Sequence, residues 1–311
     1  MTMRIFRGAS CATHKVDASH PESPDRLYAI DDQLLISGLD MVLEHVNAQP
    51  VTAEVIKLAH DDNYVDRIFE QAPTHETIWL DDDTAMTPNT IKAATEAAGA
   101  GVAAVDYVMS AKDRRGFCAV RPPGHHAEYD KAMGFCVFNN IAIAAYWAIE
   151  HYQLSRLAIV DFDVHHGNGT HNIVANDSRI QFYSSFQHPF YPYSGIPSGA
   201  DNVHVVPLDA GTRSAEYRES VAHWFDSIRQ FDPELILVSA GFDAHAEDPL
   251  GHLRLTEEDY RWISESLRDV ADECCDGRIV SMLEGGYDLS ALGRSMVAHI
   301  RGLEKLSEHY A

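Results

Sequence analysis

The sequence predicts an α/β fold in which helices cover both faces of a mostly parallel β-sheet. Short runs rich in β-branched and aromatic residues alternate with longer segments of helical periodicity along the 311 residues, and this alternation is typical of a parallel sheet. Several of the short runs are continuously apolar, as expected for strands buried on both faces. The sequence contains no internal repeat, low-complexity tract or Gly/Ser linker, so residues 1–311 are expected to form a single domain.

Seven segments have the strand pattern. They are Met3–Phe6, Phe117–Val120, Leu157–Phe162, Ile180–Ser184, Val203–Val206, Leu235–Ser239 and Ile279–Leu283. In open sheets of this class, ligands bind outside the carboxyl ends of the strands. The residues that carry chemistry are therefore expected directly after these segments.

Three segments between the strands have clear helical signatures. Residues 91–109 are rich in Ala and Gly, which predicts close packing against a neighbouring element. After Ser214, apolar residues recur on one helical face; they are Tyr217, Val221, Trp224, Phe225 and Ile228. Thr256 is expected to be the N-cap of a further helix, whose apolar face carries Tyr260, Ile263, Leu267 and Val270.

The composition narrows the functional class. The formal net charge is −23, and a negative field repels phosphate backbones, so direct nucleic-acid binding is not expected. The same field attracts cationic substrates or basic protein tails, although it also serves solubility alone. The cysteine count is odd, at 5, and no CxxC pair occurs, which argues against a disulfide framework and fits the cytoplasm. No apolar run reaches the roughly 18 residues that a membrane span needs, so no membrane association is expected.

The clearest chemical motif follows the segment Leu157–Phe162, where Asp161, Asp163 and His165 stand at alternate positions. In extended backbone, residues i and i+2 point to the same side, so Asp163 and His165 are expected to converge on a divalent metal. Asp161 has the same parity and could orient a ligand from behind. The alternative is an acidic strand end whose histidines bond to nearby loops.

Asp243 follows the segment Leu235–Ser239 and could supply a third ligand. Two aspartates, a histidine and a water make a four-coordinate zinc site with one open position, which is the catalytic arrangement. His245 lies close by in sequence, but a structural role is the more common one for such a loop histidine.

Two further strand ends complete the chemistry. His125 and His126 follow a Pro-Pro-Gly turn, and one could act as a general base while a carboxylate orients the other. Tyr287 follows two glycines after Ile279–Leu283 and could donate a hydrogen bond to a developing oxyanion. A polar turn and a packing tyrosine are the alternatives. Together the four strand ends offer a metal site, a base, an orienting carboxylate and an oxyanion donor.

The motifs RPPGHH, GFCVFNN, DFDVHHGNGT, SAGFDAH and EGGYDL occur in this order. Because it contains these motifs, the chain resembles the histone deacetylase and acetoin-utilisation deacetylase superfamily over nearly its whole length, from His20 to Tyr287. The resemblance implies the arginase/deacetylase fold, with an eight-stranded parallel sheet sandwiched between helices. Asn168 stands where class I members carry an aspartate, so the chain resembles class II, and it retains the tyrosine that some class II relatives lose.

The resemblance also implies roles for the motif residues. Asp163, His165 and Asp243 would bind one Zn²⁺ ion. His126 would act as general base and acid, His125 would contribute electrostatically through its pairing with Asp161, and Tyr287 would polarise the acetyl carbonyl.

Substrate and potassium contacts follow from the same resemblance. Phe135 and Tyr191 would flank a tunnel for the lysine methylenes, and the Gly134 carbonyl could accept the substrate N–H. Asp161 and Ser184 fit a structural K⁺ site, together with the backbone oxygens of Asp163 and His165. Arg26 could line an exit channel for acetate.

The expected activity is zinc-dependent hydrolysis of the acetyl amide of an N-acetylated lysine side chain. The main alternative is a small-molecule acetylpolyamine deacetylase, in which the run Asp81–Asp83 would bind a second amine. Members of that kind carry an acidic gatekeeper where this chain has Leu250, which weakens the alternative. An arginase-like ureohydrolase with two manganese ions and a non-catalytic acyl-lysine binding module are further alternatives. The sequence leaves open whether the chain forms a homo-oligomer.

Overall fold

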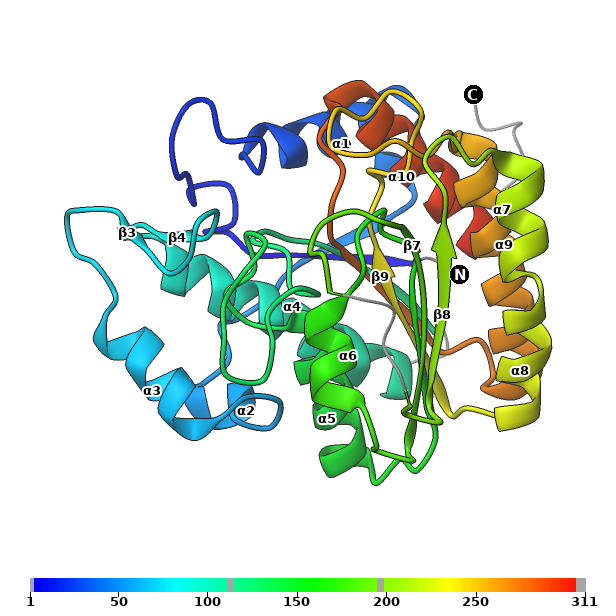
Figure 1. Ribbon diagram of the computed structural model, residues 1–311, viewed down its shortest axis with the longest axis horizontal. Helices are drawn as coiled ribbons and strands as arrows, with labels where there is room; N and C mark the ends of the chain where they lie inside the picture. The colour runs from blue at the N-terminus through cyan, green and yellow to red at the C-terminus, as the bar shows by residue number, and fades with distance from the viewer. Residues whose placement is uncertain (1–2, 111–113, 195–198, 306–311) are drawn as a thin grey trace.

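The computed structural model describes residues 3–110, 114–194 and 199–305. Its centre is an eight-stranded sheet flanked by helices (Figure 1). The strand order is β2-β1-β5-β10-β9-β6-β7-β8, and every neighbouring pair is parallel. The strands are β1 (Arg4–Arg7), β2 (Glu44–Asn47), β5 (Arg115–Ala119), β6 (Leu157–Asp161), β7 (Ile180–Gln187), β8 (Val203–Leu208), β9 (Leu235–Ala240) and β10 (Ile279–Leu283).

Helices cover both faces of this sheet. The helices of the described residues are α1 (Asp25–Ile36), α2 (Ala53–Ile56), α3 (Asp62–Glu70), α4 (Thr90–Ser110), α5 (Asn140–Tyr152), α6 (Asn168–Val174), α7 (Ser214–Val221), α8 (His223–Phe231), α9 (Glu257–Cys274) and α10 (Leu289–Glu304), with a short 3₁₀ helix, η1 (Leu39–Met41). Helices α1, α10, α9 and α8 pack side by side in one layer, and α4, α5 and α6 form the other. The expected α/β architecture is confirmed.

All seven predicted strands are present, and the eighth, β2, was missed. Its sequence is Glu-His-Val-Asn, and only Val46 is even partly buried. β2 pairs with β1 alone, at the edge of the sheet. An edge strand with one solvated face needs no apolar run, so periodicity could not reveal it.

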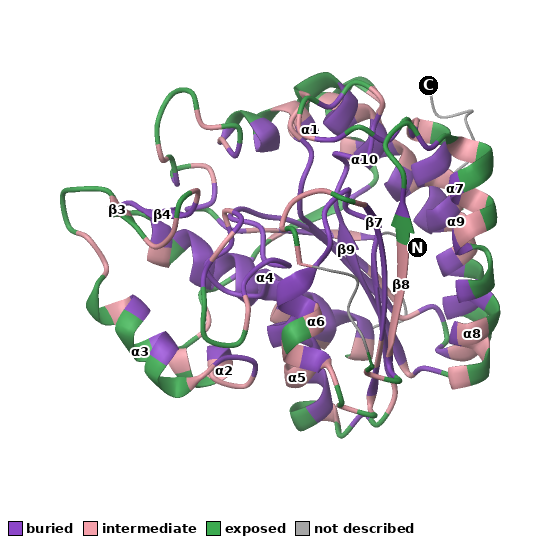
Figure 2. Cartoon of the chain, in the orientation of Figure 1, coloured by how far each residue is buried: buried purple, intermediate pink, exposed green. Residues whose placement is uncertain are grey.

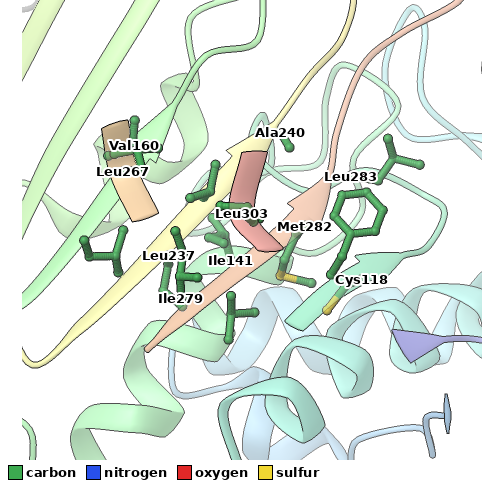
Figure 3. Close-up of a cluster of buried hydrophobic side chains, with 14 of the residues drawn as sticks. Cys118, Ile141, Val160, Leu237, Ala240, Leu267, Ile279, Met282, Leu283 and Leu303 are labelled. Atoms are coloured by element: carbon green, nitrogen blue, oxygen red, sulfur yellow. The ribbon is translucent and has the colours of Figure 1, made fainter. Parts of the chain in front are cut away.

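The central strands owe their place to burial on both faces. Every residue of β6, β9 and β10 is buried, as the continuous purple ribbon at the centre of Figure 2 shows. Figure 3 shows side chains of these strands, such as Val160, Leu237 and Met282, meeting those of the covering helices. This core holds the strand ends in fixed positions.

The helical predictions were right in composition and partly wrong in extent. The small residues of α4 do permit close approach, because a side chain at Gly101 would press on Met282 and Ala144. The face predicted after Ser214 is buried as expected, but it belongs to two helices, α7 and α8, which meet at Ala222. The Thr256 cap is confirmed: the Asp259 carboxylate accepts the Thr256 N–H at 2.9 Å.

A small antiparallel hairpin lies outside the main sheet. Its strands, β3 (Ile78–Trp79) and β4 (Ala85–Met86), have two residues each. It packs with α2 and α3 around a second apolar cluster, which includes Ile56, Tyr64 and Phe138. The loop of this hairpin contains Asp81–Asp83. Among the helices that the structure describes, none is long and apolar enough to cross a bilayer.

Candidate active site and metal centre

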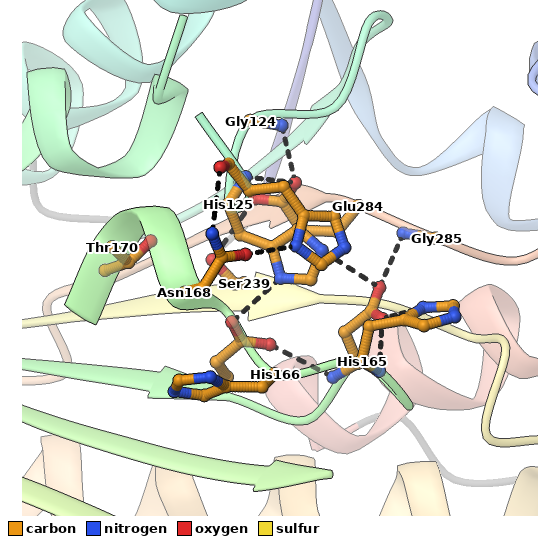
Figure 4. Close-up of polar contacts among 12 residues, drawn as sticks. Gly124, His125, His165, His166, Asn168, Thr170, Ser239, Glu284 and Gly285 are labelled. Carbon is orange, nitrogen blue, oxygen red and sulfur yellow. Dashed lines mark hydrogen bonds and ion pairs between the residues drawn. The ribbon is translucent and has the colours of Figure 1, made fainter. Parts of the chain in front are cut away.

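The four strands that precede the predicted motifs are neighbours at the centre of the sheet, in the order β5-β10-β9-β6. The motif residues therefore gather at one end of the sheet, although some of them are far apart in sequence, as Gly124 and Glu284 are, by 160 positions. Figure 4 shows His125, His165 and Gly285 converging there.

Asp163, His165 and Asp243 form the only group in the described ranges that satisfies the geometry of a metal site. Their ligand atoms lie within 4.8 Å of one another, and all three residues are buried. His165 Nδ1 lies 3.0 Å from Asp163 Oδ1 and 3.2 Å from Asp243 Oδ2. Asp243 Oδ2 is buried and, apart from this contact with His165, has no hydrogen-bond partner among the described residues. A buried carboxylate oxygen with so little hydrogen bonding indicates a site for a cation.

The convergence of Asp163 and His165 is confirmed, but the reason given from sequence was wrong. Strand β6 ends at Asp161, and residues 163–165 are bent rather than extended. Asp161 Oδ1 accepts the N–H of Asp163 at 3.1 Å, and Asp163 Oδ1 accepts the N–H of His165 at 2.9 Å. These successive side-chain turns, and not strand alternation, bring the ligands together.

Glycines make room for the carboxylates of this candidate metal-binding triad, Asp163, His165 and Asp243. A side chain at Gly241 would collide with the Asp163 carboxylate, and one at Gly285 would collide with that of Asp243. The Gly285 N–H donates to Asp163 Oδ2 at 2.8 Å. Gly241 of the SAGFDAH motif and Gly285 of the EGGYDL motif are thus required by close packing against carboxylates.

The electrostatics of the triad reflect crowded anions. Burial and the Asp163 carboxylate raise the pKa of Asp243 to about 7. Burial alone would lower the pKa of His165, but its bonds to Asp163 and Asp243 raise it to about 10. The site stabilises positive charge, which a divalent cation supplies more effectively than a proton.

His125 and His126 lie side by side, with ring centroids 4.0 Å apart, in opposite environments. His125 Nδ1 lies 3.0 Å from Asp161 Oδ2. Although burial opposes it, the Asp163 and Asp161 carboxylates raise the pKa of His125 well above its usual value. Burial and the neighbouring His125 and His165 lower the pKa of His126 well below its usual value. Opposite shifts in adjacent groups separate a charged partner from a neutral base.

The tautomer of His126 is set by an amide. Asn168 Nδ2 donates to Glu128 Oε1 at 2.7 Å, which turns the Asn168 oxygen toward His126. His126 Nδ1 lies 2.7 Å from that oxygen and must therefore carry the proton. His126 Nε2 is left as the basic nitrogen. Sequence reasoning noted Asn168 but missed Glu128.

Glu284 was also missed. Its buried carboxylate accepts the N–H groups of Gly124 and His125, at 2.7 and 3.1 Å, and the Ser239 hydroxyl at 3.1 Å. It therefore joins the ends of β5, β9 and β10. The only sequence signal was an acidic residue directly after a largely apolar strand.

A cavity of about 250 Å³ leads to the triad. Its lining includes all the residues expected to contact substrate, and consists of Asp83, His126, Gly134, Phe135, His165, Phe190, Tyr191, Pro249, Leu250, His252 and Tyr287. The Tyr191 ring stands edge-on to His126, at 5.1 Å between centroids. Phe135 lies 6.0 Å from Tyr287 across the cavity. An aromatic-walled cavity with few polar groups suits an extended aliphatic chain.

Tyr287 has contacts at both its backbone and its ring. Its N–H donates to Asp248 Oδ2 at 2.6 Å, and the Arg26 guanidinium lies 5.0 Å from its ring centroid. Burial raises the pKa of its phenol well above the usual value. The hydroxyl therefore stays protonated and can donate a hydrogen bond.

The remaining predicted residues have defined places. Asp161 and Ser184 are register partners on β6 and β7, and the buried Ser184 hydroxyl has no hydrogen-bond partner in the part of the chain that the structure describes. His245 is not in the triad, and its Nδ1 accepts the Glu247 N–H at 3.1 Å. Arg26 is buried and donates to the Gly286 carbonyl at 2.7 Å.

The comparisons agree with this geometry. The family described as the histone deacetylase domain matches residues 20–303. Histone deacetylase 14, chloroplastic, from Arabidopsis thaliana is 37% identical over 327 residues, which cover 96% of this chain and 76% of the relative. The chain belongs to the histone deacetylase family. A probable deacetylase from Methanothermobacter thermautotrophicus is 39% identical over 73% of this chain and 69% of its own length.

A solved structure of the family has the same fold. The crystal structure of the HDA15 HD domain matches with a TM-score of 0.90 at 31% identity, over 97% of this chain and 88% of that chain. The arginase/deacetylase fold is therefore confirmed, and membership of this family assigns the chain to the deacetylases.

Proposed function

We propose that the chain hydrolyses the acetyl amide of N-acetylated lysine side chains with the help of one zinc ion, releasing acetate and the free amine. The observation that carries the proposal is the aromatic-walled cavity that reaches the Asp163–His165–Asp243 group at His165 and is lined by His126 and Tyr287.

The triad fits zinc. Two carboxylates and one imidazole are a donor set that Zn²⁺ accepts in catalytic sites. The buried Asp243 oxygen, which has no hydrogen-bond partner beyond its contact with His165, supports a cation there. When bound, zinc supplies Lewis acidity, polarising the substrate carbonyl and acidifying a water. The presence of a single triad in the described ranges favours this assignment over a two-manganese ureohydrolase.

His126 is proposed as the general base and acid. Its Nδ1 proton is held by Asn168, so Nε2 accepts the proton of the attacking water and later delivers it to the leaving amine. His125, held cationic by Asp161, contributes electrostatically. The Tyr287 hydroxyl donates to the developing oxyanion. A base, an acid and an oxyanion donor together argue against a non-catalytic binding module.

The cavity walls support a lysine chain. Phe135 and Tyr191 are proposed to flank the methylenes, Leu250 also lines the cavity, and the Gly134 carbonyl is proposed to accept the amide N–H. Asp161 and Ser184 are proposed ligands of a structural K⁺ ion, supported by the unpartnered Ser184 hydroxyl.

The test is acetate release by the zinc-loaded protein from an acetyl-lysine peptide and, in parallel, from an acetylpolyamine. The apolar Leu250 favours the peptide. Faster turnover of the polyamine would instead assign the chain to small-molecule metabolism. No acetate from either substrate would refute the proposed activity, and two equivalents of bound metal per chain would favour a ureohydrolase.

A further inference from the structure

The loop of the β3–β4 hairpin is bonded to the wall of the substrate cavity. Asp83 Oδ1 accepts the Gly134 N–H at 3.0 Å, and the Thr84 hydroxyl oxygen accepts the Phe135 N–H at 3.0 Å. The Thr84 hydroxyl in turn donates to Asp83 Oδ1 at 2.9 Å. Two consecutive backbone donors of the wall are thus satisfied by two consecutive side chains, 51 positions away in sequence.

These contacts change the interpretation of the acidic run. Asp81 Oδ1 accepts the N–H groups of Asp83 and Thr84, at 3.0 and 2.8 Å, so it shapes the loop itself. Asp83 is turned toward Gly134. Asp82 alone is exposed. The suggestion that all three carboxylates bind a second substrate amine is therefore not supported, since two of them have structural partners.

The wall segment that they hold has an uncommon conformation. Gly134 has φ +58° and Phe135 has φ +68°. A non-glycine residue in the left-handed region costs conformational energy and persists only where its surroundings fix it. A side chain at Gly134 would collide with the His126 ring, so this backbone also lies directly against the proposed base.

We propose that Asp83 and Thr84 are positioning residues, which hold Gly134 and Phe135 in the left-handed conformation that directs the Phe135 ring and the Gly134 carbonyl toward the substrate. This inference rests on the proposed deacetylation. The two residues act through the backbone that they bind. Asp83 also lines the cavity, whereas Thr84 does not, so a Thr84 variant tests the positioning role alone.

The decisive variant is Thr84→Val, which keeps the shape of the side chain but removes the hydroxyl that accepts the Phe135 N–H. Losing one such bond while leaving its donor buried typically costs about tenfold or more in an equilibrium. We expect KM for the acetyl-lysine peptide to rise about tenfold, with kcat and zinc content close to wild type. Thr84→Ser retains the hydroxyl and should restore KM.

The hydrogen bonds of Asp83 and Thr84 to the Gly134 and Phe135 N–H groups are called the latch below. A second measurement tests the latch without catalysis. Hydrogen–deuterium exchange of the peptide containing Gly134 and Phe135 should accelerate about tenfold in Thr84→Val and return to the wild-type rate in Thr84→Ser. Asp83→Ala should accelerate it too, with Asp82→Ala as the matched control at the exposed neighbour. The comparison of Asp83→Ala with Asp82→Ala tests the latch if Thr84→Val folds poorly.

The outcomes separate the two hypotheses. Exchange unchanged in both Thr84→Val and Asp83→Ala would refute the latch. Faster exchange with an unaltered KM would refute its role in positioning, as would equal impairment of the Val and Ser variants. A wild-type protein that releases no acetate would refute the proposed function, while exchange would still test the latch.

Discussion

The amide of Asn168 connects a solvent-accessible carboxylate, Glu128, to the proposed base, His126. Because this partner is neutral, it orients the imidazole without stabilising its charged form. The pair His125–Asp161 has the opposite character, with a carboxylate 3.0 Å away. One neutral and one ionic partner therefore distinguish two chemically identical side chains.

The first prediction at this scale concerns Asn168→Asp. A carboxylate beside His126 should raise its pKa, typically by about 1–3 units. The acidic limb of the pH profile of kcat/KM should therefore move to higher pH, lowering activity near neutrality. A pH profile that coincides with that of the wild type would contradict the proposed control of His126 by Asn168. Glu128→Gln, which keeps an acceptor for the Asn168 amide, is the matched control.

The second prediction concerns Tyr287→Phe. Removing a single oxyanion donor typically lowers turnover by about 10²–10³-fold. We expect that loss in kcat, with metal content and thermal stability unchanged. Tyr193→Phe is the control, because this tyrosine is 79% exposed and does not line the cavity. Turnover within a few-fold of wild type would remove Tyr287 from the mechanism.

At the scale of elements, the position of each motif after a strand was predictable, and the contacts between motifs were not. Apolar runs identify β5, β6, β9 and β10, and parallel topology then brings their ends together. The roles of Glu284 and Thr84 depend on partners 160 and 51 positions away, as in the bonds from Gly124 and Phe135. No local pattern encodes such pairings. The polar edge strand β2 and the division of the helix at Ala222 into α7 and α8 were not predicted for a related reason. Hydrophobic periodicity reports which residues are buried, and not how the backbone is hydrogen-bonded.

The element-scale prediction concerns Gly241→Ala, directly after β9. The added methyl group would overlap the Asp163 carboxylate, so we expect zinc content to fall well below one equivalent. Metal analysis after dialysis measures this, with Asp163→Ala as the reference for ligand loss. Circular dichroism checks that the fold is kept. A full metal complement would show that the loop can relax, contrary to the expectation.

At the scale of the molecule, stability depends on histidines that are buried and neutral. His299 on α10 lies 2.6 Å from the Ser264 hydroxyl on α9 and 2.8 Å from the Ser281 hydroxyl on β10. Burial lowers the pKa of His299 from 6.5 to about 3, and that of His60 to about 4. Below pH 6.5 the unfolded chain takes up protons that the folded chain resists, so each such histidine favours unfolding as the pH falls.

The corresponding prediction uses His299→Gln. This variant should be less stable than wild type at pH 7.5, because the histidine's two hydroxyl contacts are disturbed. Its deficit should shrink as the pH falls from 6.5 toward 4, by up to about 1.4 kcal/mol per pH unit. Urea unfolding at several pH values measures the difference. A deficit independent of pH would mean that His299 titrates normally in the folded protein.

The strand that comes last along the described chain, β10, lies in the middle of the sheet, between β5 and β9. Before it is inserted, β2-β1-β5 and β9-β6-β7-β8 are two separate half-sheets, and Gly285 and Tyr287 have not reached the catalytic edge. During synthesis on the ribosome, a nascent chain that ends before this strand would have no continuous sheet and no complete catalytic edge. Assembly of the candidate active site therefore requires closure of the sheet by the last of its eight strands to be synthesised.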